Sequence, residues 1–401
     1  MLNSKRTKLI IESAKNQSRV SGATHRHYRY PASFSHIFAE TVIKNLSKPG
    51  DTVLDPFVGG GTSAVSSLQE YRNFYGLDIN PISIFISESK LILLSKDEIR
   101  FCEKWIKKFV RFKISSKPKR KIIQKKLDGM LNLKGLDVRQ KKRINEIKNG
   151  IEQYKYDVKK IKNKKIRQFL TCVLMRASKR VLDNQRPVHD FKYFVSRLEA
   201  HFYDMVNCVE DFQKELLLKK SQYNCKKKIK SIIVQAHIAK SNLEKKFKKN
   251  SVSLIITSPP YPRVNISYNR WQIHGRRDTI LPYWIIDNEP PKPTRLNYSR
   301  YQTNENKLEK YFSNITAGFK NIKKYCKNNC YVVQLVSFRK KTLDFKPYLK
   351  ALENAGLKEV KYAGSRLWRE VPKRRWQAIN ANKNLESNKE VLLIHRFNGS
   401  K

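Results

Sequence analysis

Two short motifs carry residue types and spacings that could do chemistry. The first is Asp55-Pro56-Phe57-Val58-Gly59-Gly60-Gly61-Thr62, between a predicted strand and a predicted helix. A backbone without β-carbons can pass close to a ligand that lies over the carboxyl end of a strand, where open α/β sheets bind nucleotides. Asp78 ends the next predicted strand, where a carboxylate can accept hydrogen bonds from both hydroxyls of a ribose. This motif therefore predicts a ligand with a nucleoside part.

Two other kinds of nucleotide site must be weighed against this motif. Gly59-x-Gly61-x-x-Ala64 also fits the loose dinucleotide fingerprint, so a nicotinamide enzyme remains an alternative on this motif alone. A P-loop is excluded, because no Gly-Lys-Ser/Thr follows the glycines and nothing is placed to hold a triphosphate with magnesium.

The second motif is Thr257-Ser258-Pro259-Pro260-Tyr261, at the end of an apolar strand. Two consecutive prolines fix φ and lack N–H donors, so the turn is rigid and its carbonyls are left to accept hydrogen bonds. Ser258 Oγ and the Pro259 carbonyl could accept the two hydrogens of an amino group. The ring of Tyr261 offers a face on which a planar base could stack.

Alternating strand and helix patterns surround both motifs, and a long helical, lysine-rich stretch over residues 96–230 separates them. The expected order is typical of an α/β fold, with about seven strands in one sheet built from two separated parts of the chain. Predicted strands cover residues 52–55, 74–78, 231–234, 253–257, 331–336, 358–362 and 390–397.

The composition indicates a polyanionic partner. Lys and Arg number 84 against 34 Asp and Glu, which leaves a formal net charge of +50. Nucleic acid is the usual partner of such a chain, although a lysine bias inherited from an AT-rich genome is the alternative. Basic runs at 117–126 and 159–167 are candidates for phosphate contact. Residues after the second motif are candidates for contact with flanking bases: Arg263, Arg270, Trp271, Arg276 and Arg277.

Taken together, the two motifs resemble those of the DNA amino-methyltransferases, which modify cytosine N4 or adenine N6. The resemblance implies a Rossmann-like, seven-stranded methyltransferase sheet with a basic, mainly helical insertion, and S-adenosylmethionine as cofactor. Residues 28–34 are similar to a Tyr-Pro-x-x-Phe stretch that contacts the methionine end of that cofactor in some members. The implied cofactor residues are Tyr30, Pro31, Phe34, Asp55, Phe57, Gly59, Gly61, Thr62 and Asp78, and the implied catalytic residues are Ser258, Pro259, Pro260 and Tyr261.

We accordingly expect a catalytic domain made of residues 1–95 and 231–401, interrupted by a DNA-contacting region at 96–230. The expected substrate is a flipped base in double-stranded DNA. The resemblance favours cytosine N4, because a serine at the first position of Ser258-Pro259-Pro260-Tyr261 is associated with that amine in this family. A companion restriction endonuclease would be the partner. Adenine N6, an RNA amine and a non-catalytic nucleic-acid binder remain alternatives. A cytosine-C5 mechanism is disfavoured, because no proline precedes a cysteine.

The remaining sequence features concern metals and location. The six cysteines show no metal-ligand spacing, which predicts a protein without a metal site. The N-terminus lacks an apolar signal core, and no window reaches the roughly 18 apolar residues of a membrane span. We therefore expect a cytoplasmic protein.

Overall fold

The computed structural model of the chain describes residues 4–18, 20–30, 33–113, 133, 135–263, 271–274, 277–291, 305–338, 340–360, 366–370 and 389–397. Among them, no helix is both long and apolar enough to span a membrane.

One eight-stranded sheet organises the molecule, in the order β3-β2-β1-β4-β7-β10-β8, with the short β9 paired to β10. Strands β3 to β7 along this path are parallel, whereas β10 is antiparallel to β7, β8 and β9. This arrangement confirms the predicted α/β fold class. The strands are β1 (Thr52–Asp55), β2 (Asn73–Asp78), β3 (Ser231–Gln235), β4 (Val252–Thr257), β7 (Cys326–Ser337), β8 (Leu357–Glu359), β9 (Trp368–Glu370) and β10 (Lys389–Phe397).

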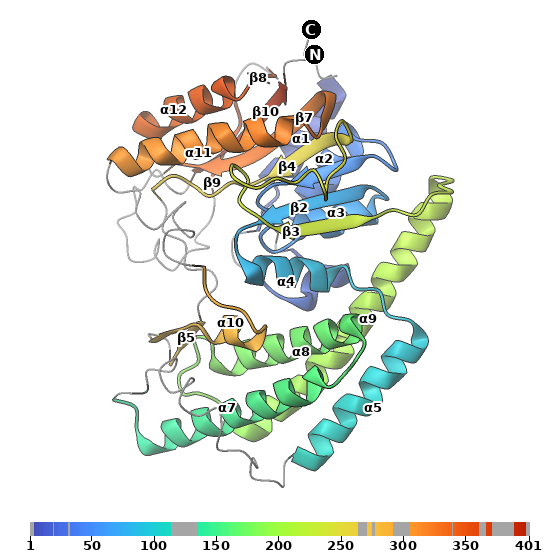
Figure 1. Ribbon diagram of the computed structural model, residues 1–401, viewed down its shortest axis with the longest axis vertical. Helices are drawn as coiled ribbons and strands as arrows, with labels where there is room; N and C mark the ends of the chain where they lie inside the picture. The colour runs from blue at the N-terminus through green and yellow to red at the C-terminus, as the bar shows by residue number, and fades with distance from the viewer. Residues whose placement is uncertain are drawn as a thin grey trace.

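Helices cover both faces of the sheet (Figure 1). Adjacent residues of one strand serve opposite faces, as the period of two requires: Val53 and Leu54 are both fully buried, yet they belong to different apolar clusters. One face packs against α1 (Ser4–Lys15), α2 (His36–Leu46) and α3 (Thr62–Gln69), and the other against α11 (Glu305–Lys323) and α12 (Lys341–Asn354).

A second, helical part lies below the sheet in Figure 1. It contains α5 (Lys96–Lys113), α7 (Val138–Lys159), α8 (Lys164–Leu182) and α9 (Phe191–Gln222). Three of these helices begin where a side chain caps free backbone amides. Asp137 accepts from Gln140 N, Asn163 from the amides of residues 165 and 166, and Asp190 from Tyr193 N. One apolar cluster holds this part together and includes Ile82 and Ile86 of α4 (Pro81–Lys90), the helix after β2.

Part of the chain beyond β4 also packs into this helical cluster. It comprises β5 (Trp271–Ile273) and α10 (Leu281–Ile285), and β5 pairs with β6 (Arg277–Thr279). The division of the chain at residues 95 and 230 stays a prediction. The segment with β5 and α10 lies in the predicted catalytic part, 231–401, yet it packs with the helical part.

Candidate active site at the carboxyl edge of the sheet

The two motifs lie side by side because β1 and β4 are neighbouring parallel strands, with Leu54 opposite Ile255. Their carboxyl ends therefore open onto the same edge of the sheet. A direct hydrogen bond joins the motifs: Thr257 Oγ1 donates to Asp55 Oδ1 at 2.6 Å. The fold thus brings together residues that are 202 positions apart in the chain.

Asp55 holds the two motifs to each other. Its buried carboxylate accepts from Phe57 N at 3.0 Å and from Ser63 Oγ at 2.5 Å, in addition to Thr257. Burial raises the pKa of this carboxyl to about 6, although the three hydrogen bonds act in the opposite direction. Since all three partners belong to the motifs or to the start of α3, this side chain shapes the loop from within.

The glycine loop is crowded by neighbouring protein atoms. Gly61 has φ +76° and precedes the first residue of α3, Thr62, which is buried. A β-carbon on Gly61 would lie 3.0 Å from the Ser87 Cα, and one on Gly60 would lie 2.5 Å from the Tyr30 Cβ. Only glycine fits both positions without movement of the surroundings.

Asp78 fastens the glycine loop to the end of β2. Its Oδ2 accepts from Gly59 N at 3.0 Å and its Oδ1 from Asn80 N at 2.9 Å. Burial raises its pKa to about 6. Hydrogen bonds from the Ser83 side chain and the Ile79 amide also act on this half-buried carboxylate, so a ribose would compete with these donors for its roughly four acceptor positions.

The remaining residues predicted to hold the cofactor lie at separate places around the loop. The Tyr30 side chain lies against Gly60, and its hydroxyl is 2.9 Å from Ser83 Oγ. Phe34 is buried and packs edge-on against Phe38, with ring centroids 5.8 Å apart. Pro31 lies outside the described residues. Phe57 is half-buried beside the apolar cluster on the α11 face.

Two residues that the sequence analysis missed support the loop from α4. The Lys90 Nζ donates to Gly60 O at 2.7 Å, and Ser87 Oγ donates to Gly59 O at 3.0 Å. Lys90 is only 3% exposed, and burial lowers the pKa of its ammonium group to about 8. A sequence signal was present: Ser83, Ser87 and Lys90 recur at helical spacing on one face of α4.

The Ser-Pro-Pro-Tyr turn follows β4 directly. Ser258 Oγ lies 3.0 Å from the Tyr261 hydroxyl, which donates to Glu390 Oε1 at 2.8 Å. The Pro260 carbonyl accepts from Tyr311 at 2.8 Å. Within the part of the chain that the structure describes, no group donates to the Pro259 carbonyl. The Tyr261 side chain is only 7% exposed, so little of its ring is open for stacking.

Two of the residues predicted to contact DNA, Arg263 and Trp271, make hydrogen bonds within the protein. The Arg263 Nε donates to both oxygens of Asp344, at 2.9 and 3.0 Å. Trp271 is 2% exposed and donates its indole N–H to Tyr28 at 3.2 Å, so in this conformation it is a core residue of the helical part. The described backbone places Arg277 at the start of β6. Arg270 and Arg276 lie outside the described residues.

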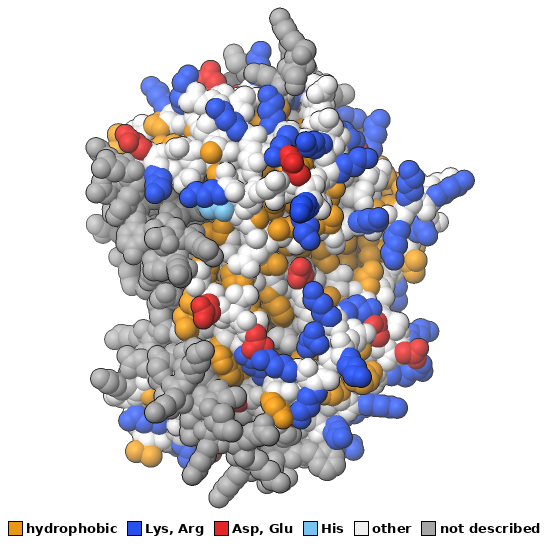
Figure 2. Space-filling view, in the orientation of Figure 1, with side chains coloured by type: hydrophobic (Ala, Val, Ile, Leu, Met, Phe, Trp, Pro, Cys, Tyr) orange, Lys and Arg blue, Asp and Glu red, His pale blue; other side chains and the backbone are white. Residues whose placement is uncertain are grey.

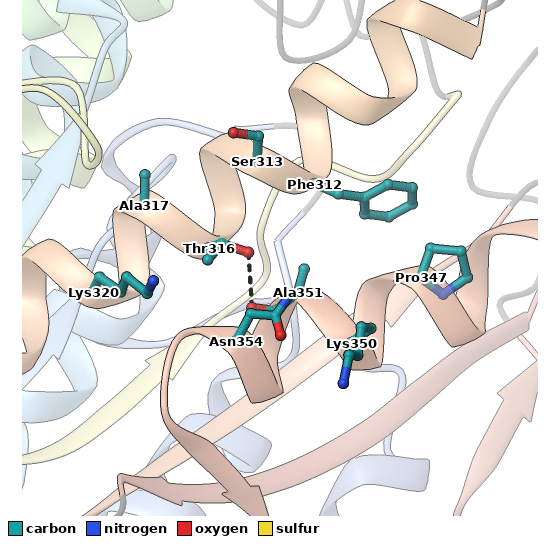
Figure 3. A pocket seen from close by; sticks show the side chains of 9 residues that line it. All are labelled: Phe312, Ser313, Thr316, Ala317, Lys320, Pro347, Lys350, Ala351 and Asn354. Atoms are coloured by element: carbon teal, nitrogen blue, oxygen red, sulfur yellow. Dashed lines mark hydrogen bonds between the residues drawn. The ribbon is translucent and has the colours of Figure 1, made fainter.

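Two cavities open elsewhere on the molecule. A cavity of about 570 Å³ lies between α11 and α12, where Thr316 donates to Ala351 O at 2.9 Å (Figure 3). Another, of about 330 Å³, lies between α4 and the helical part. Neither is lined by a residue of the two motifs. The chemistry of the motifs, and not cavity size, therefore locates the candidate site.

Comparison with known proteins finds relatives of the part of the chain that holds the first motif. Residues 6–89 match the model of a DNA methylase family. Over 62 residues the chain is 42% identical to the Type II methyltransferase M.BglI of Bacillus subtilis, a match that covers 16% of this chain and 18% of the relative. It is 47% identical over 60 residues to M.Cfr9I of Citrobacter freundii, covering 15% and 20%.

The rRNA methyltransferase aviRa from Streptomyces viridochromogenes aligns over 94% of this chain and 90% of its own, with 8% identity and a TM-score of 0.35. The curated relatives are matched over about a fifth of their length or less. Within that span lies the first motif, from Asp55 to Thr62. Residues 6–89 are thus similar to DNA methylases, which confirms the predicted resemblance over that part of the chain.

Proposed function

We propose that the protein transfers a methyl group from S-adenosylmethionine to the exocyclic amine of a base in double-stranded DNA. Cytosine N4 is the proposed position, and adenine N6 is the alternative. The observation that carries the proposal is the hydrogen bond between Thr257 and Asp55, because it holds a cofactor-type loop and an amine-accepting turn at one edge of the sheet. The Type II methyltransferases among its relatives support a role beside a companion restriction endonuclease.

The residues present fit this cofactor. The loop from Gly59 to Gly61 follows the carboxyl end of β1, and the half-buried Asp78 carboxylate beside it is an acceptor for a ribose hydroxyl. S-adenosylmethionine supplies an electrophilic methyl group when it is bound. We propose Tyr30, whose side chain lies against Gly60, as a contact for a ligand on the loop.

The task of the turn is to make a poor nucleophile react. The lone pair of an exocyclic amine is conjugated into the ring of the base. Ser258 Oγ and the Pro259 carbonyl would accept the two amine hydrogens and pull the nitrogen toward sp³ geometry. As the new N–C bond forms and the S–C bond breaks, the nitrogen gives up one proton to solvent. Fixed acceptors of this kind lower the barrier, because they need no reorganisation during the reaction.

Sequencing of DNA that distinguishes modified bases tests the proposal in cells that express the protein. We expect N4-methylcytosine within one fixed sequence context, and less of it in cells that express the Ser258→Ala variant at the same level. N6-methyladenine in a fixed context would instead overturn the choice of base. Unmodified DNA together with methylated RNA from the same cells would overturn DNA as the substrate.

A further inference from the structure

A chain of hydrogen bonds runs from the Ser-Pro-Pro-Tyr turn into the core of the sheet. Ser258 Oγ contacts the Tyr261 hydroxyl, and this hydroxyl donates to Glu390 Oε1 in β10. The other oxygen, Glu390 Oε2, accepts from Arg369 of β9 through Nε at 3.0 Å and Nη2 at 2.5 Å. Glu390 and Arg369 are both 8% exposed. Glu390 lies 129 residues from Tyr261 in the chain.

The chemistry of these groups determines which partner donates in each of these hydrogen bonds. A guanidinium only donates, and Glu390 beside it is a carboxylate that accepts at both oxygens. The Tyr261 hydroxyl therefore donates its one proton to Glu390. Its oxygen can then only accept from Ser258. The Ser258 proton points inward, and the lone pairs of its oxygen are left for a partner at the edge of the sheet.

This direction matters for the reaction proposed above, on which the inference rests. A serine hydroxyl can donate or accept, whereas the target amine needs an acceptor. A hydroxyl that donated its proton to the amine nitrogen would engage the lone pair that has to attack the methyl group. We infer that Glu390 is a positioning residue: through Tyr261 it holds Ser258 as an obligatory acceptor for the amine of the target base.

Glu390→Gln should reverse the donor and acceptor roles along these hydrogen bonds, while the side chain keeps its shape. The amide has to turn its carbonyl toward Arg369, which only donates, and its NH₂ group then faces Tyr261. The Tyr261 hydroxyl would accept from this NH₂ and donate to Ser258, so the serine proton would point at the amine. We expect the methyl-transfer step to slow by about tenfold or more, the worth of one lost acceptor in a charge-assisted network. Affinity for S-adenosylmethionine and for DNA should stay unchanged.

Single-turnover methyl transfer in preformed enzyme–DNA complexes tests the inference with a double-mutant cycle. Tyr261→Phe removes the link and lets Ser258 rotate, so its loss should be smaller than that of Glu390→Gln. The double variant Glu390→Gln/Tyr261→Phe should match Tyr261→Phe alone, because the influence of Glu390 passes through the tyrosine hydroxyl. Glu359→Gln, which alters a carboxylate paired with Arg366 at 2.6 Å in the neighbouring β8, is the matched control and should keep the wild-type rate.

The outcomes separate the inference from the proposed function. If the wild-type protein methylates no DNA, both are wrong. If the wild type is active and Glu390→Gln is equally fast, or if the two losses multiply in the double variant, Glu390 does not act through Tyr261 and the inference alone is overturned. A loss that appears as weaker cofactor binding would assign Glu390 a structural role and would overturn it as well.

Discussion

At the scale of single residues, two carboxylates at the site, the buried Asp55 and the half-buried Asp78, have separate tasks. Asp55 spends its oxygens on Phe57, Ser63 and Thr257 and so ties the two motifs together. Asp78 holds backbone amides at the end of β2 and lies half-buried beside the loop of the proposed cofactor site. Burial raises the pKa of both carboxyls to about 6, which brings their titration close to neutral pH.

Cofactor binding should therefore weaken in mild acid. Above pH 6 Asp78 is a carboxylate that can accept from ribose hydroxyls, and below pH 6 the added proton removes an acceptor. We expect the Kd for S-adenosylmethionine to rise as the pH falls below about 6, by at most about tenfold per pH unit for one linked proton. Calorimetric titrations from pH 8 to pH 5 measure this dependence.

Two variants show which carboxyl group causes the pH dependence of cofactor binding. Asp78→Asn should bind the cofactor weakly and without change across this range, because the titrating acceptor is gone. Asp55→Asn should retain the dependence, since its carboxylate faces the motifs themselves. A dependence that survives in Asp78→Asn and disappears in Asp55→Asn would reverse the two assignments.

At the scale of elements, the glycine loop is held between β1 and α4. Ser87 and Lys90 of α4 donate to the carbonyls of Gly59 and Gly60, and a β-carbon on Gly61 would meet the Ser87 backbone at 3.0 Å. Gly50 offers a comparison, because its φ of +82° is equally left-handed but no atom lies within 4 Å of its missing β-carbon.

Gly61→Ala should accordingly cost more than Gly50→Ala. Both variants carry the backbone penalty of about 1 kcal/mol for a left-handed alanine. Gly61→Ala adds the displacement of α4, worth about 1–3 kcal/mol as overpacking, and should also weaken cofactor binding. Chemical denaturation and calorimetry measure the two effects. Equal losses of stability in both variants would show that α4 yields easily and that the crowding is unimportant.

The local pattern predicted the elements around both motifs well. Strand 52–55 was predicted as it is found, and the strands at 74–78 and 253–257 lie within one residue of β2 and β4. Short elements such as β5, β9 and α10 were missed, because three to five residues carry no periodic signal. The bonds from Lys90 and Glu390 were missed for another reason. They join residues that only the folded sheet brings together, so spacing in the chain does not reveal them.

At the scale of the whole molecule, the distribution of the +50 charge matters more than its size. Lys and Arg side chains spread over both parts of the molecule with few acidic neighbours (Figure 2). Some of the predicted basic run at 159–167 is engaged within the protein: Lys159 pairs with Asp287 at 2.7 Å and Lys165 with Glu98 at 2.5 Å. Such lysines are poorer candidates for phosphate contact.

Exposed lysines occur at both edges of the sheet. Lys340 and Lys341, at the start of α12, and Lys389, at the start of β10, lie at the carboxyl end of β7, on the edge that holds Ser258. The Lys389 Nζ is 3.9 Å from the exposed Glu370 carboxylate, a longer pair than those of Lys159 and Lys165, and the Lys341 Nζ lies 4.2 Å from the Trp368 ring centroid. The bond between Arg263 and Asp344 links the first turn of α12 to the segment after the Ser-Pro-Pro-Tyr turn. The exposed run 226–228 precedes β3 and therefore lies at the amino edge.

The lysines at the carboxyl edge of the sheet should consequently account for much of the salt dependence of DNA binding. Each neutralised phosphate contributes about −0.9 to the slope of log K against log salt concentration. Replacing Lys340, Lys341 and Lys389 together by Gln should make the slope shallower by about 2–3 and weaken binding equally on all sequences. The matched triple variant at 226–228 removes the same charge from the amino edge and should leave the slope nearly unchanged.

Fluorescence anisotropy with duplex DNA between low and physiological salt measures both slopes. Equal reductions in the two variants would mean that net charge alone attracts the DNA, and a flat wild-type slope would mean that the charge reflects composition and not a polyanionic partner.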